Sequence, residues 1–149
     1  VTAREHDAVT GRLLGTWKML SWTRRLVATG EEADAFGPLP VGYITYSGDG
    51  RVMALVLKAD RQAPQGAFPT DREKTALFDS LLVYAGTYRI DHEKIIHRID
   101  ASWNQSWTGT EQTRFYKLDG NRLTLTGAPA KSPIDGKDTV YTIVWEKLD

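Results

Sequence analysis

The chain has 149 residues, which is long enough for one domain with a substantial core. Nineteen basic and nineteen acidic side chains give a formal net charge of zero, so the sequence lacks the electrostatic footprint of a protein that binds nucleic acid or an anionic membrane. Cysteine is absent, which removes disulfides, thiolate metal sites and cysteine nucleophiles together.

The sequence carries no signal for a membrane span or for export. No apolar run reaches the roughly 18 residues that cross a bilayer, and residues 1–7 are charged, without the apolar stretch of a secretory signal. Together with the absence of cysteine, this predicts a cytoplasmic protein. No repeat, low-complexity tract or linker divides the sequence, so we expect a single domain over residues 1–149.

A short helix is expected at the start of the chain, followed by three strands. Thr2 and Glu5 have the spacing of a capping box, and Gly15 breaks the helix that they would begin. Alternating apolar residues and Gly-rich turns predict strands over three ranges: 15–29, 42–46 and 51–57.

The first of these strands has an irregular pattern. Trp17, Met19 and Ser21 share a face that we expect to point inward, whereas Arg24 is expected to point outward. Trp22 breaks this alternation, which predicts either a β-bulge or a buried contact on the outer side.

A second helix signal separates the third and fourth strands. Thr70 and Glu73 form a capping box, and the helix behind them carries apolar residues at helical spacing: Leu77, Phe78, Leu81 and Leu82. This helix interrupts an otherwise all-β pattern, so we expect it to pack at the mouth of a barrel. Strand signals then cover five further ranges: 84–90, 95–103, 112–116, 122–126 and 139–148.

Eight strands joined mostly by hairpins predict an all-β fold. The economical arrangement is an eight-stranded up-and-down antiparallel barrel, with a short N-terminal helix and one helix between strands 3 and 4, because closure removes the unpaired sheet edges. A barrel of this size is either filled by its own side chains or holds one small ligand.

Two neighbouring strands carry most of the functional signal. In the first, alternate residues form a mostly apolar face: Ile95, His97, Ile99, Ala101 and Trp103. In the second, three residues share a more polar face: Gln112, Arg114 and Tyr116. If both faces point inward, they form an apolar wall with a few convergent polar groups, which is typical of a small-molecule site. The alternative is that Arg114 extends to the rim and that His97 is a satisfied core histidine.

The candidate ligand-binding residues are those that the strands would present to one cavity: Tyr46, Met53, Tyr84, Tyr88, His97, Trp103, Gln112, Arg114 and Tyr116. The tyrosines offer hydrogen bonds to a carbonyl or an enolate, although tyrosine is also common in strands and at barrel rims. Met53 and Trp103 fit a core as well as a ligand wall.

The residue patterns restrict the chemistry. We expect no metal, because the three histidines lack ligand spacing, and no cofactor, since no phosphate-binding loop is present. The sequence also lacks a nucleophile elbow, so a covalent nucleophile has little support. One hypothesis is a carrier of a small apolar or amphipathic molecule, acting as a monomer or homodimer without nucleic acid or membrane. Another is a cofactor-free isomerase, cyclase or lyase with His97 as acid or base, helped by Arg114 and Tyr88. A third, weaker hypothesis is a filled barrel that serves as an interaction module.

Several blocks of the sequence resemble one family: 14–18 (LGTWK), 40–46 (PVGYITY), 50–53 (GRVM), 84–88 (YAGTY), 97–102 (HRIDAS) and 145–147 (WEK), with Trp107, Gly109, Thr110, Glu111, Gln112 and Arg114. Together they resemble the bacterial and fungal lipocalin-like domain family, a group of calycin-type small β-barrels. The resemblance implies a ligand-holding barrel whose closed end is plugged by Trp17, and it implies no catalytic residues. One departure is Lys147, where an arginine is expected to stack over Trp17.

Overall fold

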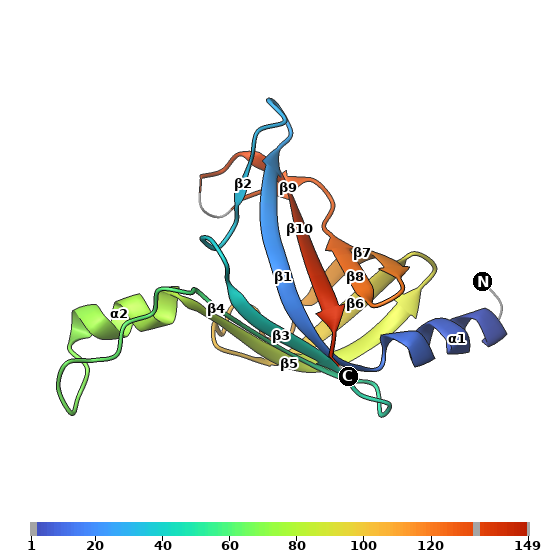
Figure 1. The fold of residues 1–149 in the computed structure, drawn as a ribbon, viewed down its shortest axis with the longest axis horizontal. Coiled ribbons are helices and arrows are strands. Elements are labelled where there is room, and N and C mark those ends of the chain that lie inside the picture. The colour runs from blue at the N-terminus through green and yellow to red at the C-terminus, as the bar shows by residue number, and fades with distance from the viewer. Residues whose placement is uncertain (1–2, 133–134, 149) are drawn as a thin grey trace.

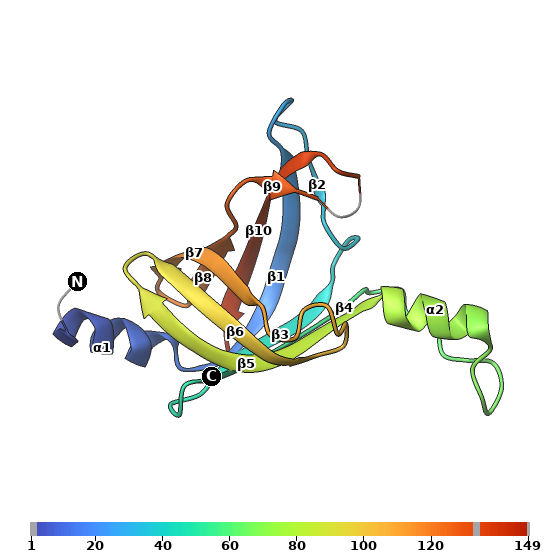
Figure 2. The ribbon, with the colours of Figure 1, turned by 180° about the vertical axis from the view of Figure 1, so that it is seen from behind.

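The structure is a computed structural model that describes residues 3–132 and 135–148, with side chains from residue 8 onward. Eight antiparallel strands form a closed barrel (Figures 1 and 2). The barrel closes because β1 pairs with β3 on one side and with β10 on the other. The barrel strands are β1 (Gly15–Leu26), β3 (Val41–Tyr46), β4 (Arg51–Leu57), β5 (Leu81–Asp91), β6 (Lys94–Ser102), β7 (Glu111–Asp119), β8 (Arg122–Thr126) and β10 (Asp138–Lys147).

Two helices and two short strands complete the fold. Helix α1 (Ala3–Leu13) precedes β1, and helix α2 (Asp71–Asp79) lies between β4 and β5, so both predicted helices are confirmed. Strands β2 (Glu32–Asp34) and β9 (Ala130–Lys131) extend the sheet beside β1 and β10. The predicted capping box of α1 includes Thr2 and lies outside the described residues.

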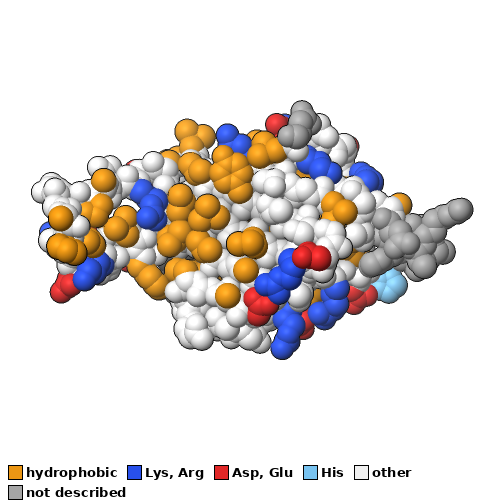
Figure 3. Space-filling model, turned by 90° about the horizontal axis from the view of Figure 1, so that it is seen from below, with side chains coloured by type: hydrophobic (Ala, Val, Ile, Leu, Met, Phe, Trp, Pro, Cys, Tyr) orange, Lys and Arg blue, Asp and Glu red, His pale blue; other side chains and the backbone are white. Residues whose placement is uncertain are grey.

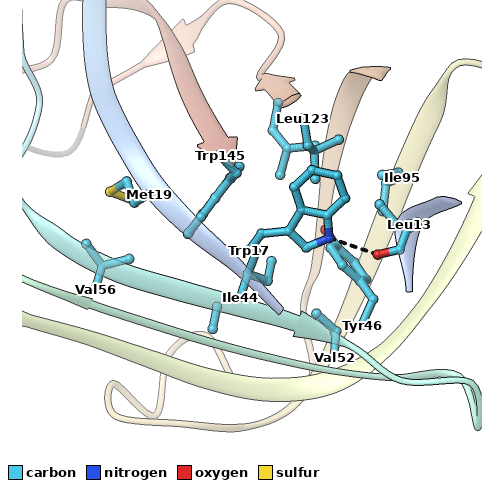
Figure 4. Packing of buried hydrophobic residues seen from close by; sticks show 12 residues of the cluster. Leu13, Trp17, Met19, Ile44, Tyr46, Val52, Val56, Ile95, Leu123 and Trp145 are labelled. Carbon is cyan, nitrogen blue, oxygen red and sulfur yellow. Dashed lines mark hydrogen bonds between the residues drawn. The ribbon is translucent and has the colours of Figure 1, made fainter. Parts of the chain in front are cut away.

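Trp17 closes one end of the barrel. Its side chain is fully buried, and its indole N–H donates a 2.8 Å hydrogen bond to the carbonyl of Leu13 at the end of α1 (Figure 4). The Lys147 ammonium lies 5.5 Å from the centre of the Trp17 ring and donates to the Arg12 carbonyl at 2.9 Å. Lysine therefore occupies the stacking position expected of an arginine, and its second contact fastens α1 over the plug.

A β-bulge in β1 reverses the alternation beyond the plug. The pairing with β10 shifts between Met19 and Ser21, so Trp22 pairs with Ile143 and faces the interior. Arg24 lies two residues beyond Trp22 and therefore on the same side of the strand, where its guanidinium donates to the buried Thr139 hydroxyl at 3.4 Å and to Asp135 at 2.7 Å. The prediction of Ser21 inside and Arg24 outside is therefore wrong, whereas the bulge signalled by Trp22 is present.

A second β-bulge lies in β6, where this strand pairs with β5. Ala85 pairs with Ala101 but Gly86 pairs with Ile99, which leaves Asp100 as the extra residue. At Gly86 the two strands approach so closely that a Cβ would lie 1.9 Å from the carbonyl oxygen of Arg98. Glycine is required there for space, and the bulge exposes Ala101, which was expected to face inward.

Helix α2 does not cover the barrel. Its capping box, Thr70 with Glu73, is present as predicted, but the helix stands away from the barrel and buries no residue (Figures 1 and 2). Leu81 and Leu82 pair with β4 as part of β5, so the apolar residues expected to fasten the helix belong to the sheet instead. The prediction that this helix packs at the barrel mouth is wrong.

Apolar side chains also occur on the outer surface. Hydrophobic groups gather on the face viewed from below, from the α2 arm toward the barrel (Figure 3). The large exposed hydrophobic residues include Val41, Met53, Leu55, Phe68 and Phe78. Among the described residues, no helix has the length and apolar character needed to cross a membrane.

Candidate ligand-binding site

A partly enclosed cavity of about 50 Å³ lies inside the barrel. All eight barrel strands contribute to its wall, which consists of Trp22, Ile44, Ala54, Val56, Leu82, Tyr84, His97, Trp107, Arg114, Leu125, Ile143 and Trp145. Most of these side chains are aliphatic or aromatic, and the few polar groups converge from β5, β6 and β7. The plug residue Trp17 is not part of the wall, so the cavity occupies the part of the barrel beyond the plug.

A buried tyrosine–histidine–tyrosine chain borders the cavity. The Nε2 atom of His97 lies 2.8 Å from the Tyr46 hydroxyl, and Nδ1 lies 2.7 Å from the Tyr84 hydroxyl. Burial lowers the pKa of His97 to about 3, and the nearby charge of Arg114 acts in the same direction. Burial also raises the pKa of Tyr84 to about 12. At neutral pH the imidazole is therefore uncharged and Tyr84 keeps its proton.

The donor and acceptor of each hydrogen bond between Tyr46, His97 and Tyr84 follow from the protonation state of His97. A neutral imidazole has one N–H donor and one acceptor nitrogen. Tyr46 is almost fully buried, and His97 is its one hydroxyl partner in the described structure, so its O–H is satisfied when it donates to Nε2. His97 then donates from Nδ1 to the Tyr84 oxygen. The Tyr84 O–H remains available to donate to a molecule in the cavity.

Arg114 places a positive charge on the cavity wall. Its guanidinium donates to the Thr113 carbonyl at 3.0 Å and to the Gln112 side-chain oxygen at 3.4 Å. Within the described part of the chain, no carboxylate lies within ion-pair distance of Arg114. The same part of the chain contains no cluster of three or more acidic, histidine or cysteine side chains suited to a metal ion.

Two tryptophans of the wall carry buried donors. The indole N–H groups of Trp22 and Trp145 are inaccessible to water and have no acceptor among the described residues. Most buried polar groups in proteins are hydrogen-bonded, and an unpaired one costs about 1–3 kcal/mol. Both indoles belong to residues of the same cavity wall.

The sequence matches the lipocalin-like domain family over residues 14–148. The chain belongs to this family. A crystal structure of an uncharacterized protein from Bacteroides eggerthii DSM 20697 aligns with 91% of this chain and 99% of its own, at 13% identity and a TM-score of 0.45. No curated protein matches the sequence. Membership confirms the predicted resemblance and agrees with the closed eight-stranded barrel.

Five of the predicted site residues meet in this lipocalin-like barrel. Tyr84, His97 and Arg114 line the cavity, Tyr46 contacts His97 from behind it, and Gln112 supports Arg114. The inward orientation expected for the polar face of β7 is present. His97 is nevertheless a paired, neutral core histidine as well as a wall residue, because both ring nitrogens already have partners.

Met53 and Trp103 do not line the cavity. Met53 is 62% exposed on the outer face of β4, since both faces of this strand are apolar and Val52, not Met53, points inward. Trp103 follows the Asp100 bulge, which reverses the alternation from which its position was predicted. It packs instead against Trp107, with 5.1 Å between ring centres, and Trp107 joins the wall in its place.

Tyr88 and Tyr116 point inward but lie outside the cavity wall. The Tyr88 hydroxyl donates to the Ser47 carbonyl at 3.0 Å, and its ring packs edge-on against Tyr46. Tyr116 donates to the His92 carbonyl at 3.1 Å, beside α1 at the plugged end. The ligand contacts of both tyrosines and the catalytic role of Tyr88 stay predictions.

The sequence patterns did not indicate most of the apolar wall, including all three of its tryptophans. The missed residues are Trp22, Ile44, Ala54, Val56, Leu82, Trp107, Leu125, Ile143 and Trp145. For Ile143 and Trp145 a signal was present, because both lie on the alternating face of the last strand. Trp22 and Trp107 follow irregular backbone, where strict alternation gives no reliable orientation.

Stability is expected to fall as the pH decreases from 7 to 5. A histidine in the unfolded chain titrates near 6.5, whereas the pKa of folded His97 is about 3, so between these values the unfolded state binds a proton that the folded state does not. The stabilisation is complete above pH 6.5, and roughly 2 kcal/mol is lost by pH 5. Urea denaturation at both pH values measures this loss. A variant at the exposed His92, His92→Gln, should retain it, and equal wild-type stability at both values would contradict it.

Proposed function

We propose that this barrel holds a small, mostly apolar molecule and acts as a carrier or sequestering protein. The observation that supports this is the cavity itself: all eight strands supply its wall, the wall is mainly apolar, and a few polar groups converge on it. Small-molecule sites have this composition, because apolar contact supplies affinity while a few polar groups fix the orientation of the ligand.

The size of the cavity restricts the ligand. Its volume of about 50 Å³ is well below the roughly 300–1,000 Å³ of pockets that enclose drug-sized ligands. The proposed ligand is therefore small or slender, with one end inside the barrel. A larger ligand requires displacement of the Trp107 side chain, whose ring contacts Tyr84 and Trp103.

Filling the cavity should abolish binding of a slender apolar probe. We expect 1-hexanol to bind the wild-type protein and to shift the NMR signals of the wall indoles. Ala54→Phe places a ring inside the barrel and should remove this binding, at a cost in stability of about 1–3 kcal/mol. Met53→Phe also introduces a phenyl ring, but on the outer face of the same strand, and should leave binding intact. Equal binding by both folded variants would refute the proposed function.

A cofactor-free isomerase, cyclase or lyase is the second candidate. The Tyr46–His97–Tyr84 chain supports it, because a hydrogen-bonded relay ends at a hydroxyl on the cavity wall. In this candidate Tyr84 is the proton donor, while His97 positions it and does not act directly as a base. Turnover of a retained molecule that Tyr84→Phe abolishes would support this candidate, and unchanged turnover would exclude it.

We also propose a cytoplasmic protein that acts as a monomer or homodimer, without nucleic acid or membrane partners. The zero net charge and the absence of cysteine support the location and the partners. Sedimentation analysis of the purified protein tests the oligomeric state, and a larger assembly would contradict the proposal.

A further inference from the structure

Several described arginines, such as Arg72 and Arg122, have no ion-pair partner, but Arg114 is the one among them that lines the cavity. Arg24, Arg51 and Arg89 each pair with a carboxylate, namely Asp135, Asp100 and Glu111. The partners of Arg114 are two neutral oxygens of its own strand, although its side chain borders a mainly apolar wall. A cation beside a low-dielectric wall loses hydration, and an anion within reach offsets that loss most effectively.

The polar groups available to a molecule in the cavity are donors. Arg114 contributes guanidinium N–H groups, and the Tyr84 O–H remains free once its oxygen accepts from His97. The indoles of Trp22 and Trp145 also belong to wall residues, and their buried N–H groups have no acceptor among the described residues. The cavity wall contains no carboxylate. Such a surface is complementary to a ligand group that accepts several hydrogen bonds and carries negative charge.

We propose that the ligand is a small organic acid whose carboxylate binds Arg114 and the Tyr84 hydroxyl. This inference rests on the proposed function of ligand binding and adds the chemical class of the ligand. A carboxylate has two oxygens with about four acceptor sites and matches the planar fork of a guanidinium. The apolar remainder of the acid lies against Val56, Leu82 and Ile143. An ammonium group would meet a like charge, and a hydrocarbon would leave the donors unpaired.

Three probes with the same six-carbon chain test this inference: hexanoate, 1-hexanol and hexylammonium, titrated at pH 7 by calorimetry. We expect wild type to bind hexanoate about tenfold or more tightly than 1-hexanol, since hydrogen bonds to charged groups are the stronger ones, and hexylammonium least. Hexanoate should also shift the NMR signals of the Trp22 and Trp145 indole N–H groups. Assignment of those signals uses single Trp→Phe variants.

Variants at Arg114 test whether its guanidinium is responsible for the preference for hexanoate. Arg114→Gln should lower the affinity for hexanoate to about that for 1-hexanol. Arg114→Lys keeps the charge but not the fork and should restore part of the preference. The control is Arg72→Gln, which removes an exposed arginine on α2 and should leave all three affinities unchanged.

The possible outcomes separate this inference from the proposed function. Equal affinity for hexanoate and 1-hexanol, or a preference for hexanoate that persists in Arg114→Gln, would overturn the carboxylate assignment and leave the apolar cavity site intact. Hexanoate binding without any shift of the two indole signals would also overturn it, because the acid would then lie elsewhere. Binding of 1-hexanol that survives Ala54→Phe would overturn the proposed function as well.

Discussion

Trp17→Ala is expected to destabilise the folded protein by about 3–5 kcal/mol, the usual cost of removing a fully buried large aromatic side chain. Trp17 has no exposed surface, packs among the core residues of the plugged end, and holds α1 through the Leu13 carbonyl (Figure 4). Its loss removes apolar contact, leaves a cavity and frees the Lys147 ammonium from its ring. Because small proteins are stable by only about 5–15 kcal/mol, this single change threatens the fold.

Urea denaturation followed by circular dichroism measures this effect. The matched control is Phe68→Ala, which removes an aromatic ring that is 87% exposed and should change stability by less than about 0.5 kcal/mol. Trp17→Phe should fall between the two, since it retains a ring but loses the hydrogen bond to Leu13. A Trp17→Ala protein as stable as Phe68→Ala would show that the plug is not a major determinant of stability.

Gly86→Ala is expected to cost about 3 kcal/mol or more, at the upper end of the range for overpacked sites. A Cβ at this position would lie 1.9 Å from the Arg98 carbonyl oxygen and 3.0 Å from the Cα of Ile99. The obstructing atoms are backbone atoms of the paired strand β6, so relief requires separation of β5 from β6 next to the bulge. The same separation would displace Tyr84 and His97, which come from these two strands.

Thermal denaturation and the NMR spectrum of Gly86→Ala test this prediction together. Gly11→Ala is the control, because nothing lies within 4 Å of the added Cβ and alanine favours the helix that contains it. The two alanine substitutions should therefore change stability in opposite directions. A Gly86→Ala protein with wild-type stability would contradict the close strand approach at the bulge.

The sequence predicted the strands of the barrel more completely than the side chains that line its interior. Hairpin turns, alternation and the capping box at Thr70 predicted the strand order and the helix between β4 and β5, because these signals are local. The predicted side-chain orientation was wrong where one extra residue in a strand reverses the alternation. The bulge before Ser21 brought Trp22 inside, and the bulge at Asp100 exchanged Trp103 for Trp107.

Other features depended on contacts that no local pattern encodes. Strand β4 is apolar on both faces, so alternation alone did not show that Val52 and Ala54, and not Met53, point inward. The pairing of His97 with Tyr46 joins residues 51 positions apart, and it depends on barrel closure. Arg114 was placed correctly because its strand alternates strictly between exposed and partly buried residues.

Native mass spectrometry of gently purified protein, before and after organic extraction, tests the central claim most directly. Wild type is expected to retain a small molecule that extraction removes, and Ala54→Phe is expected to lack it. The recovered molecule should be an organic acid with an apolar remainder. A bare mass for wild type, or the same retained molecule on Ala54→Phe, would contradict a ligand-holding cavity inside the barrel.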